Sequence, residues 1–108
     1  MRQEHNKLIR DRIPEIIRQA GRECEVETMS LKDYHQALFN KLVEEAKEAA
    51  EAKPDNLVEE LADVYEVIDA ILANSEIDKD VVLARQEQKR QEKGGFVKKL
   101  RLSWTEQI

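Results

Sequence analysis

The sequence predicts a mainly α protein, built as a four-helix bundle, and two observations carry this prediction. Aromatic residues make up only 5% of the chain, Gly and Pro are few, and Leu, Ile, Val and Ala supply most of the apolar content. Apolar side chains also recur at helical spacing over long segments that short polar turns separate. A length of 108 residues suits one domain with one modest core, which we assign to residues 1–108.

The first helix is expected within residues 8–22, after a basic entry segment. Pro14 suits a first helical turn, where its missing N–H is not needed, and Asp11 is the expected cap before it. Gly21 is expected to end the helix. Residues 23–29 then alternate imperfectly between polar and apolar, as a short strand would.

Two longer helices follow, over residues 31–52 and 57–73, and the turn between them covers residues 53–56. Ser30 is the expected N-cap of the first, because Asp33 follows it at the capping-box spacing. Each helix carries one apolar stripe along its length. We therefore expect the pair to form an antiparallel hairpin.

A fourth helix is expected to open at residues 77–78 and to run to residue 93. It is apolar only near its start, and Gly94 is expected to stop it. Residues 96–102 then alternate weakly. A short two-stranded β element, formed by this segment and residues 23–29, is the one addition to the helices that the sequence allows.

Charge and composition exclude several classes of function. The net charge of −5 argues against nonspecific binding to nucleic-acid polymers or to a membrane surface. No apolar run approaches the roughly 18 residues of a membrane span, and the N-terminal residues lack the apolar stretch of a signal peptide. The single cysteine, Cys24, excludes an internal disulfide and a Cys-rich zinc site. We expect a cytoplasmic protein.

The same acidic pattern occurs twice, at residues 44–48 and 59–63, with Pro54 between the copies. If the chain reverses at this proline, the two copies face each other. On a helical wheel, Glu45 and Glu60 fall inside the apolar stripes, each about 20° from a leucine, valine or isoleucine. The acids three residues further on lie about 60° away, at the margin of each stripe.

Converging carboxylates are unstable unless a cation neutralises them. An all-oxygen set without His or Cys favours Mg²⁺, with Mn²⁺ as the alternative, and Mg²⁺ commonly takes further ligands from phosphates. We therefore expect a phosphoanhydride substrate. The predicted metal ligands are Glu45, Glu48, Glu60 and Asp63. Glu44 and Glu59 also fit solvated helix faces, which need no ligand.

An acidic site that binds a polyanion needs cations around it. Two basic groups are the candidates for phosphate contacts: Lys7, Arg10 and Arg12 near the start, and Lys89, Lys93 and Lys98 near the end. The alternative is that each of these is an ordinary solvated charge.

These residues resemble a known family, the MazG-like nucleoside triphosphate pyrophosphohydrolases, within the all-α superfamily that also holds phosphoribosyl-ATP pyrophosphohydrolase and the dimeric dUTPases. The family motif E-E-x-x-E, followed by E-x-x-D, is matched at residues 44–48 and 60–63. Residues 6–17 and 93–99 are similar to the terminal signatures of a small single-domain subgroup. The resemblance covers nearly the whole chain.

The resemblance implies hydrolysis between the α and β phosphates of a nucleoside triphosphate, which gives a monophosphate and pyrophosphate. It implies Mg²⁺ on the four predicted ligands, and Glu44 and Glu45 as the candidate catalytic residues. Glu44 would orient water or bind a second metal. Because the family forms dimers that sometimes pair, we expect a homodimer or homotetramer with the site near the interface.

Two other functions share these features. One is the phosphoribosyl-ATP pyrophosphohydrolase step of histidine biosynthesis, which uses the same motif. The other is a non-catalytic helical dimer that binds a nucleotide or a partner protein. No residue in the sequence identifies the base of a nucleotide.

Overall fold

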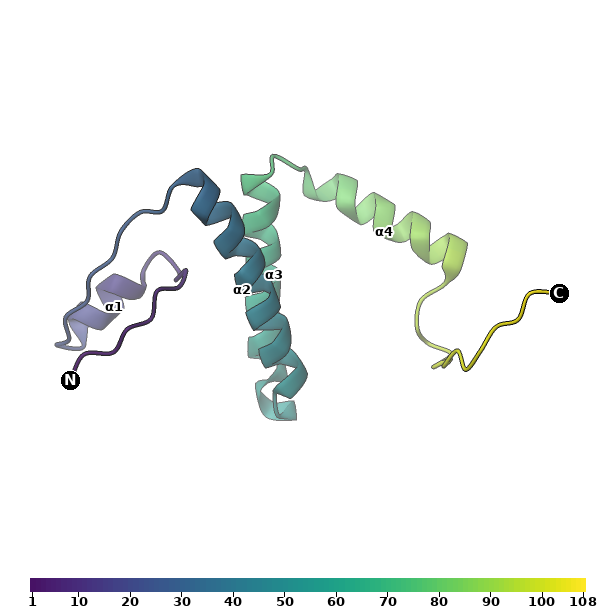
Figure 1. The fold of residues 1–108 in the computed structure, drawn as a ribbon, viewed down its shortest axis with the longest axis horizontal. Helices are drawn as coiled ribbons and strands as arrows, with labels where there is room; N and C mark the ends of the chain where they lie inside the picture. The colour runs from purple at the N-terminus through teal and green to yellow at the C-terminus, as the bar shows by residue number, and fades with distance from the viewer. The chain divides into compact units, whose positions relative to one another are not determined.

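A computed structural model describes all residues from 1 to 108, and it contains helices and no strand. The elements, in order, are α1 (Ile13–Gln19), α2 (Leu31–Glu51), the 3-10 turn η1 (Pro54–Asn56), α3 (Leu57–Asn74) and α4 (Lys79–Lys93) (Figure 1). The prediction of a mainly α protein with four helices is therefore confirmed. The chain divides into two compact units, Met1–Glu76 and Ile77–Ile108. The assignment to a single domain stays a prediction.

Within the first unit, α2 and α3 pack side by side as a helical hairpin (Figure 1). The short turn η1 reverses the chain, and the backbone N–H of Asn56 donates to the carbonyl of Lys53 at 2.9 Å. Leu38 and Val67 are the buried apolar residues of this core. In the apolar stripes of the two helices, Leu38 lies about 20° from Glu45 and Val67 about 20° from Glu60, so the helical period identifies the packed faces correctly.

Ser30 caps α2 as predicted. Its Oγ accepts a hydrogen bond from the backbone N–H of Asp33 at 3.1 Å, and its own backbone is extended. This bond satisfies one of the N–H groups that a helix start leaves without a partner. The cap therefore defines where the long helix begins.

The prediction of Asp11 as the cap of α1 is wrong. Arg12 occupies the cap position, and no side chain caps the helix. Pro14 lies in the first turn and has no N–H, so there is one donor fewer for a cap to satisfy. The other end agrees with expectation, because Gly21 follows the helix with φ 79° and donates its N–H to the carbonyl of Arg18 at 3.0 Å.

The predicted strands at residues 23–29 and 96–102 are wrong, since both segments are irregular. A strand needs a neighbour to pair its backbone groups, and the two segments belong to different units. Alternation without a partner strand does not create a sheet.

In the second unit, α4 begins and ends as expected. Asp78 caps it by accepting from the N–H of Asp80 at 2.9 Å, and Gly94 ends it with φ 81°. The apolar residues near its start, Val81, Val82 and Leu83, are exposed. No helix in the structure has both the length and the apolar character that crossing a membrane requires.

Candidate functional site

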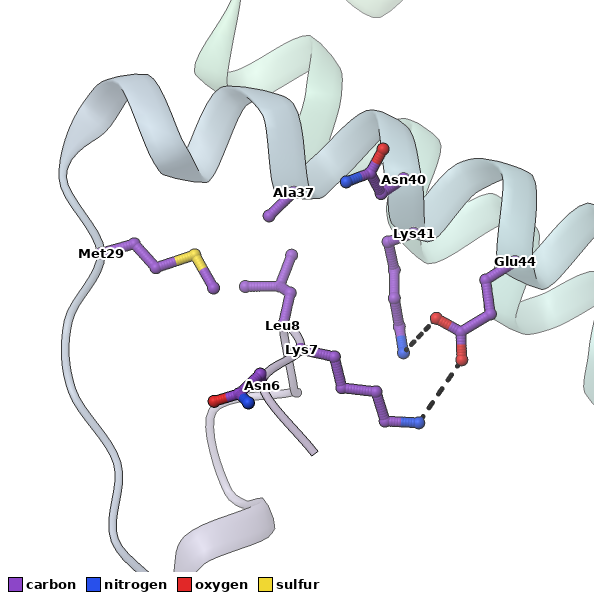
Figure 2. A pocket seen from close by; sticks show the side chains of 8 residues that line it. All are labelled: Asn6, Lys7, Leu8, Met29, Ala37, Asn40, Lys41 and Glu44. Atoms are coloured by element: carbon purple, nitrogen blue, oxygen red, sulfur yellow. Dashed lines mark hydrogen bonds and ion pairs between the residues drawn. The ribbon is translucent and has the colours of Figure 1, made fainter. Parts of the chain in front are cut away.

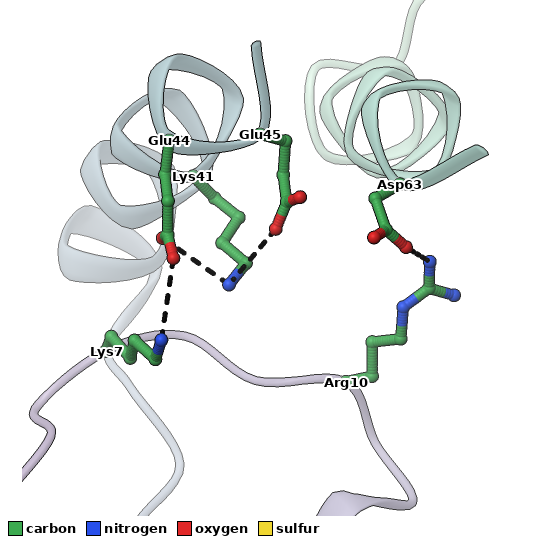
Figure 3. Close-up of polar contacts among 6 residues, drawn as sticks. All are labelled: Lys7, Arg10, Lys41, Glu44, Glu45 and Asp63. Carbon is green, nitrogen blue, oxygen red and sulfur yellow. Dashed lines mark hydrogen bonds and ion pairs between the residues drawn. The ribbon is translucent and has the colours of Figure 1, made fainter. Parts of the chain in front are cut away.

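The hairpin brings three of the four predicted metal ligands together. Glu45 on α2 and Glu60 and Asp63 on α3 each offer one carboxylate oxygen, and these oxygens all lie within 4.8 Å of one another. Figure 3 shows the side chains of Glu45 and Asp63 extending from the two helices toward the same side, where the segment with Lys7 and Arg10 lies. The convergence follows from the wheel positions of these residues and the reversal at η1.

Two carboxylate oxygens of this cluster are buried without a hydrogen-bond partner. They are Oε2 of Glu45 and Oε2 of Glu60. Glu45 is 6% exposed and is the one buried charged residue of the chain. Buried polar atoms are nearly always paired, and an unpaired carboxylate oxygen is costly. A bound cation is one partner that would satisfy both oxygens.

Burial raises the pKa of Glu45 above its ordinary value of 4.5. The carboxylate of Glu48 raises this pKa further by repulsion, whereas the ammonium of Lys41 opposes the change. Holding Glu45 ionised therefore costs free energy when no metal is bound. A divalent cation bound beside Glu45 would instead favour its ionised form.

Glu48 lies near this cluster but outside the group of converging oxygens. It is exposed, which fits its predicted place at the margin of the apolar stripe, and it is close enough to Glu45 to raise the pKa of that residue. Its role as a metal ligand stays a prediction.

Two basic residues of the segment before α1, Lys7 and Arg10, lie against the acidic residues (Figure 3). Arg10 Nη2 donates to Asp63 Oδ1 at 2.7 Å, and Lys7 Nζ lies 3.5 Å from Glu44 Oε1. Arg12 instead pairs with its helix neighbour Glu15 at 3.0 Å. Of the N-terminal cations predicted for phosphate, two are therefore beside the carboxylates.

Lys41 is part of the site, and sequence reasoning missed it. Its Nζ lies 3.4 Å from Glu45 Oε1 and 3.5 Å from Glu44 Oε2, and its side chain is only 19% exposed. The signal was present, because Lys41 precedes these acids by three and four residues, the spacings at which helical side chains meet.

Glu44 lies between two ammonium groups, those of Lys7 and Lys41. These contacts orient its carboxylate beside Glu45, on the same helix. Its catalytic role stays a prediction, and its side chain is 33% exposed. Glu59 is exposed, as its alternative interpretation expects.

The remaining basic candidates, Lys89, Lys93 and Lys98, belong to the second unit. All three are exposed. Their role at a substrate phosphate stays a prediction.

Comparisons of the chain with models of protein families, with curated proteins and with solved structures find no match.

Proposed function

We propose that this protein hydrolyses a nucleoside triphosphate to a monophosphate and pyrophosphate, with Mg²⁺ as its cofactor. One observation carries the proposal. Two buried and unpaired carboxylate oxygens, from Glu45 and Glu60, belong to a cluster that also includes Asp63. Carboxylate oxygens are the ligands that a hard divalent cation prefers, and here they converge from two facing helices.

The residues present fit this cation. Glu45, Glu60 and Asp63 would hold it, with Glu48 as the fourth proposed ligand, and the all-oxygen donor set suits Mg²⁺ or Mn²⁺ rather than zinc. When bound, such a cation neutralises charge on phosphate oxygens and polarises a water molecule.

The basic residues of the site would bind the polyphosphate. Arg10, Lys7 and Lys41 lie against the acidic residues and can exchange those contacts for phosphate oxygens once the carboxylates are neutralised. Arginine suits phosphate particularly well, because its guanidinium donates two parallel hydrogen bonds.

Glu44 is the proposed proton acceptor. In the reaction, a water oxygen forms a bond to phosphorus, the α–β bridging P–O bond breaks, and the water proton passes to a carboxylate. Glu44 lies between the ammonium groups of Lys7 and Lys41, which orient its carboxylate. Glu45 would contribute by positioning the reacting groups.

The products of the reaction test this function. Purified protein with Mg²⁺ is incubated with each canonical triphosphate, with modified triphosphates and with phosphoribosyl-ATP, and the phosphorus products are identified by ³¹P NMR. Release of pyrophosphate is expected. Release of orthophosphate would show cleavage at the γ-phosphate and would contradict the proposal. Turnover of phosphoribosyl-ATP alone would favour the step in histidine biosynthesis, and binding without turnover would favour the non-catalytic dimer.

We propose a homodimer or homotetramer as the active form. The hairpin helices carry a second set of apolar side chains that are exposed: Phe39 and Val43 on α2, and Val58, Leu61 and Tyr65 on α3. Exposed apolar surface of this extent is typical of association sites. A second copy of the hairpin would bury it, as in a helical bundle. The proposed setting is the cytoplasm, in the clearance of unwanted nucleotides.

A further inference from the structure

A cavity of about 110 Å³ lies in the first unit, between the N-terminal segment and one face of α2. One end of it is apolar and is formed by Leu8, Met29 and Ala37 (Figure 2). The other end is charged and is formed in part by Lys41 and Glu44. The volume is several times what one water molecule needs.

Lys41 connects the charged end of this cavity to the acidic cluster. Lys41 lines the cavity and also reaches Glu45, the buried member of the cluster, at 3.4 Å. A ligand that occupied both places would therefore place an uncharged part against the apolar end and an anionic part beside the carboxylates. A nucleotide has this division of character.

Asn40 gives the wall of the cavity a hydrogen-bond donor. Its Oδ1 already accepts from Gln36 Nε2 at 3.2 Å, which leaves the amide N–H groups to donate. In Figure 2 the amide nitrogen of Asn40 lies on the side toward Ala37. A carbonyl oxygen or a ring nitrogen, the acceptors that heterocyclic bases carry, suits this position.

We infer that this cavity binds the heterocyclic base of the nucleotide, with the base against Leu8, Met29 and Ala37 and an acceptor atom of its ring on Asn40. This inference rests on the proposed function, because it assigns the part of the same substrate that the acidic cluster does not hold. Small Ala37 leaves the space that the ring occupies. Lys41 would lie where the base end of the bound nucleotide meets its phosphate end.

Substitution of Ala37 by leucine tests the inference, because the larger side chain fills the cavity without changing any charge. The matched control is Ala73→Leu, an exposed alanine on α3. Asn40→Ala is the second variant. Because the side chain of Asn40 is exposed, this substitution is expected to leave the fold intact. Circular dichroism and thermal melts establish that each variant folds.

The measurement is calorimetric affinity, in the presence of Mn²⁺, for two probes. One is the set of α,β-methylene analogues of the canonical nucleoside triphosphates, and the other is inorganic tripolyphosphate, which has no base. The best analogue is expected to bind wild-type protein at least about tenfold more tightly than tripolyphosphate, or about 1.4 kcal/mol. Ala37→Leu and Asn40→Ala are expected to remove most of that advantage and to leave tripolyphosphate affinity and the Ala73→Leu control unchanged.

Two results would overturn the inference: equal affinity of wild-type protein for the analogues and for tripolyphosphate, or full retention of analogue affinity by Ala37→Leu. The analogues cannot be cleaved between the α and β phosphates, so their binding does not depend on the reaction. If they bind as expected but triphosphates release no pyrophosphate, the base site stands and the proposed activity fails.

Discussion

Glu45 of α2 and Glu60 of α3 each bury one carboxylate oxygen, Oε2, that has no hydrogen-bond partner. With Asp63 they form a group of oxygens within 4.8 Å of one another, and Glu45 is 6% exposed. Two helices that packed for stability alone would be expected to place apolar side chains at these positions. The proposed cation would satisfy both of these oxygens.

Glu45→Gln is expected to stabilise the metal-free protein at neutral pH. Because the folded-state pKa of Glu45 is raised above 4.5, the folded protein holds this proton to higher pH than the unfolded chain does. Stability is therefore lost as pH rises from about 4.5 through the raised pKa, and glutamine avoids that loss. Thermal melts in EDTA should show a higher Tm for the variant at pH 8 and no such gain at pH 4.

The exposed carboxamide variant Glu66→Gln is the control for this experiment, because its carboxylate is in solvent. Its Tm should follow that of the wild-type protein at both pH values. A Glu45→Gln variant that is less stable than wild type at pH 8 in EDTA would mean that the ionised carboxylate of Glu45 does not destabilise the folded protein.

Arg10→Ala is expected to change nucleotide and metal binding in opposite directions. The pair with Asp63 is short, at 2.7 Å, but both side chains are at least 40% exposed, so its loss should cost less than about 1 kcal/mol of stability. Without Arg10, Asp63 is free for a cation, and Mn²⁺ should bind somewhat more tightly. The KM for a triphosphate should rise about tenfold, a change of about 1.4 kcal/mol.

Steady-state kinetics and Mn²⁺ titration measure both effects, with exposed Arg18→Ala as the control. A purely structural role for Arg10 would weaken both kinds of binding together. That outcome would remove Arg10 from the substrate site.

Ser30→Ala is expected to destabilise the hairpin without touching the site. It removes the acceptor of the Asp33 N–H bond, which costs about 1 kcal/mol, or a fall in Tm of about 4 °C. Mn²⁺ affinity should not change in the folded variant. Ser103→Ala, outside any helix, should leave the Tm unchanged, and equal melts for the two variants would show that the cap contributes nothing.

Tyr65→Glu is expected to convert the proposed oligomer to a monomer. Tyr65 is 64% exposed in the single chain and shares a face of α3 with Val58 and Leu61, which are also exposed. A charge at the centre of a buried apolar contact opposes association. Sedimentation velocity should show a dimer or tetramer for wild type and for Glu66→Gln. A wild-type protein that sediments as a monomer at micromolar concentration would refute the oligomer.

The hairpin and its acidic cluster could be predicted from the sequence because helical periodicity reports which residues share a face. Glu45 and Glu60 lie at stripe positions, and the cap at Ser30 has a local signature that needs no tertiary information. These features depend on residues close together in the chain. They can therefore be predicted from the sequence alone.

The rest depends on contacts that the sequence does not encode locally. The need for cations at an acidic site predicts Lys7 and Arg10 near it, but their segment is irregular, so no period predicts their pairing with Glu44 and Asp63. The strand predictions failed for a related reason, because pairing requires a distant partner. Lys41 is different, because its spacing of four residues from Glu45 is one at which side chains on a helix meet, so this contact is predictable from the sequence.

The affinity of the protein for Mn²⁺, measured by electron paramagnetic resonance with wild type, Glu60→Gln and Glu66→Gln, tests the central claim most directly. Wild type and Glu66→Gln are expected to bind Mn²⁺ equally, with competition by Mg²⁺, whereas Glu60→Gln should bind at least about tenfold more weakly, which is about 1.4 kcal/mol. Equal Mn²⁺ affinity in all three proteins, or no binding by wild type, would contradict the shared cation between Glu45 and Glu60.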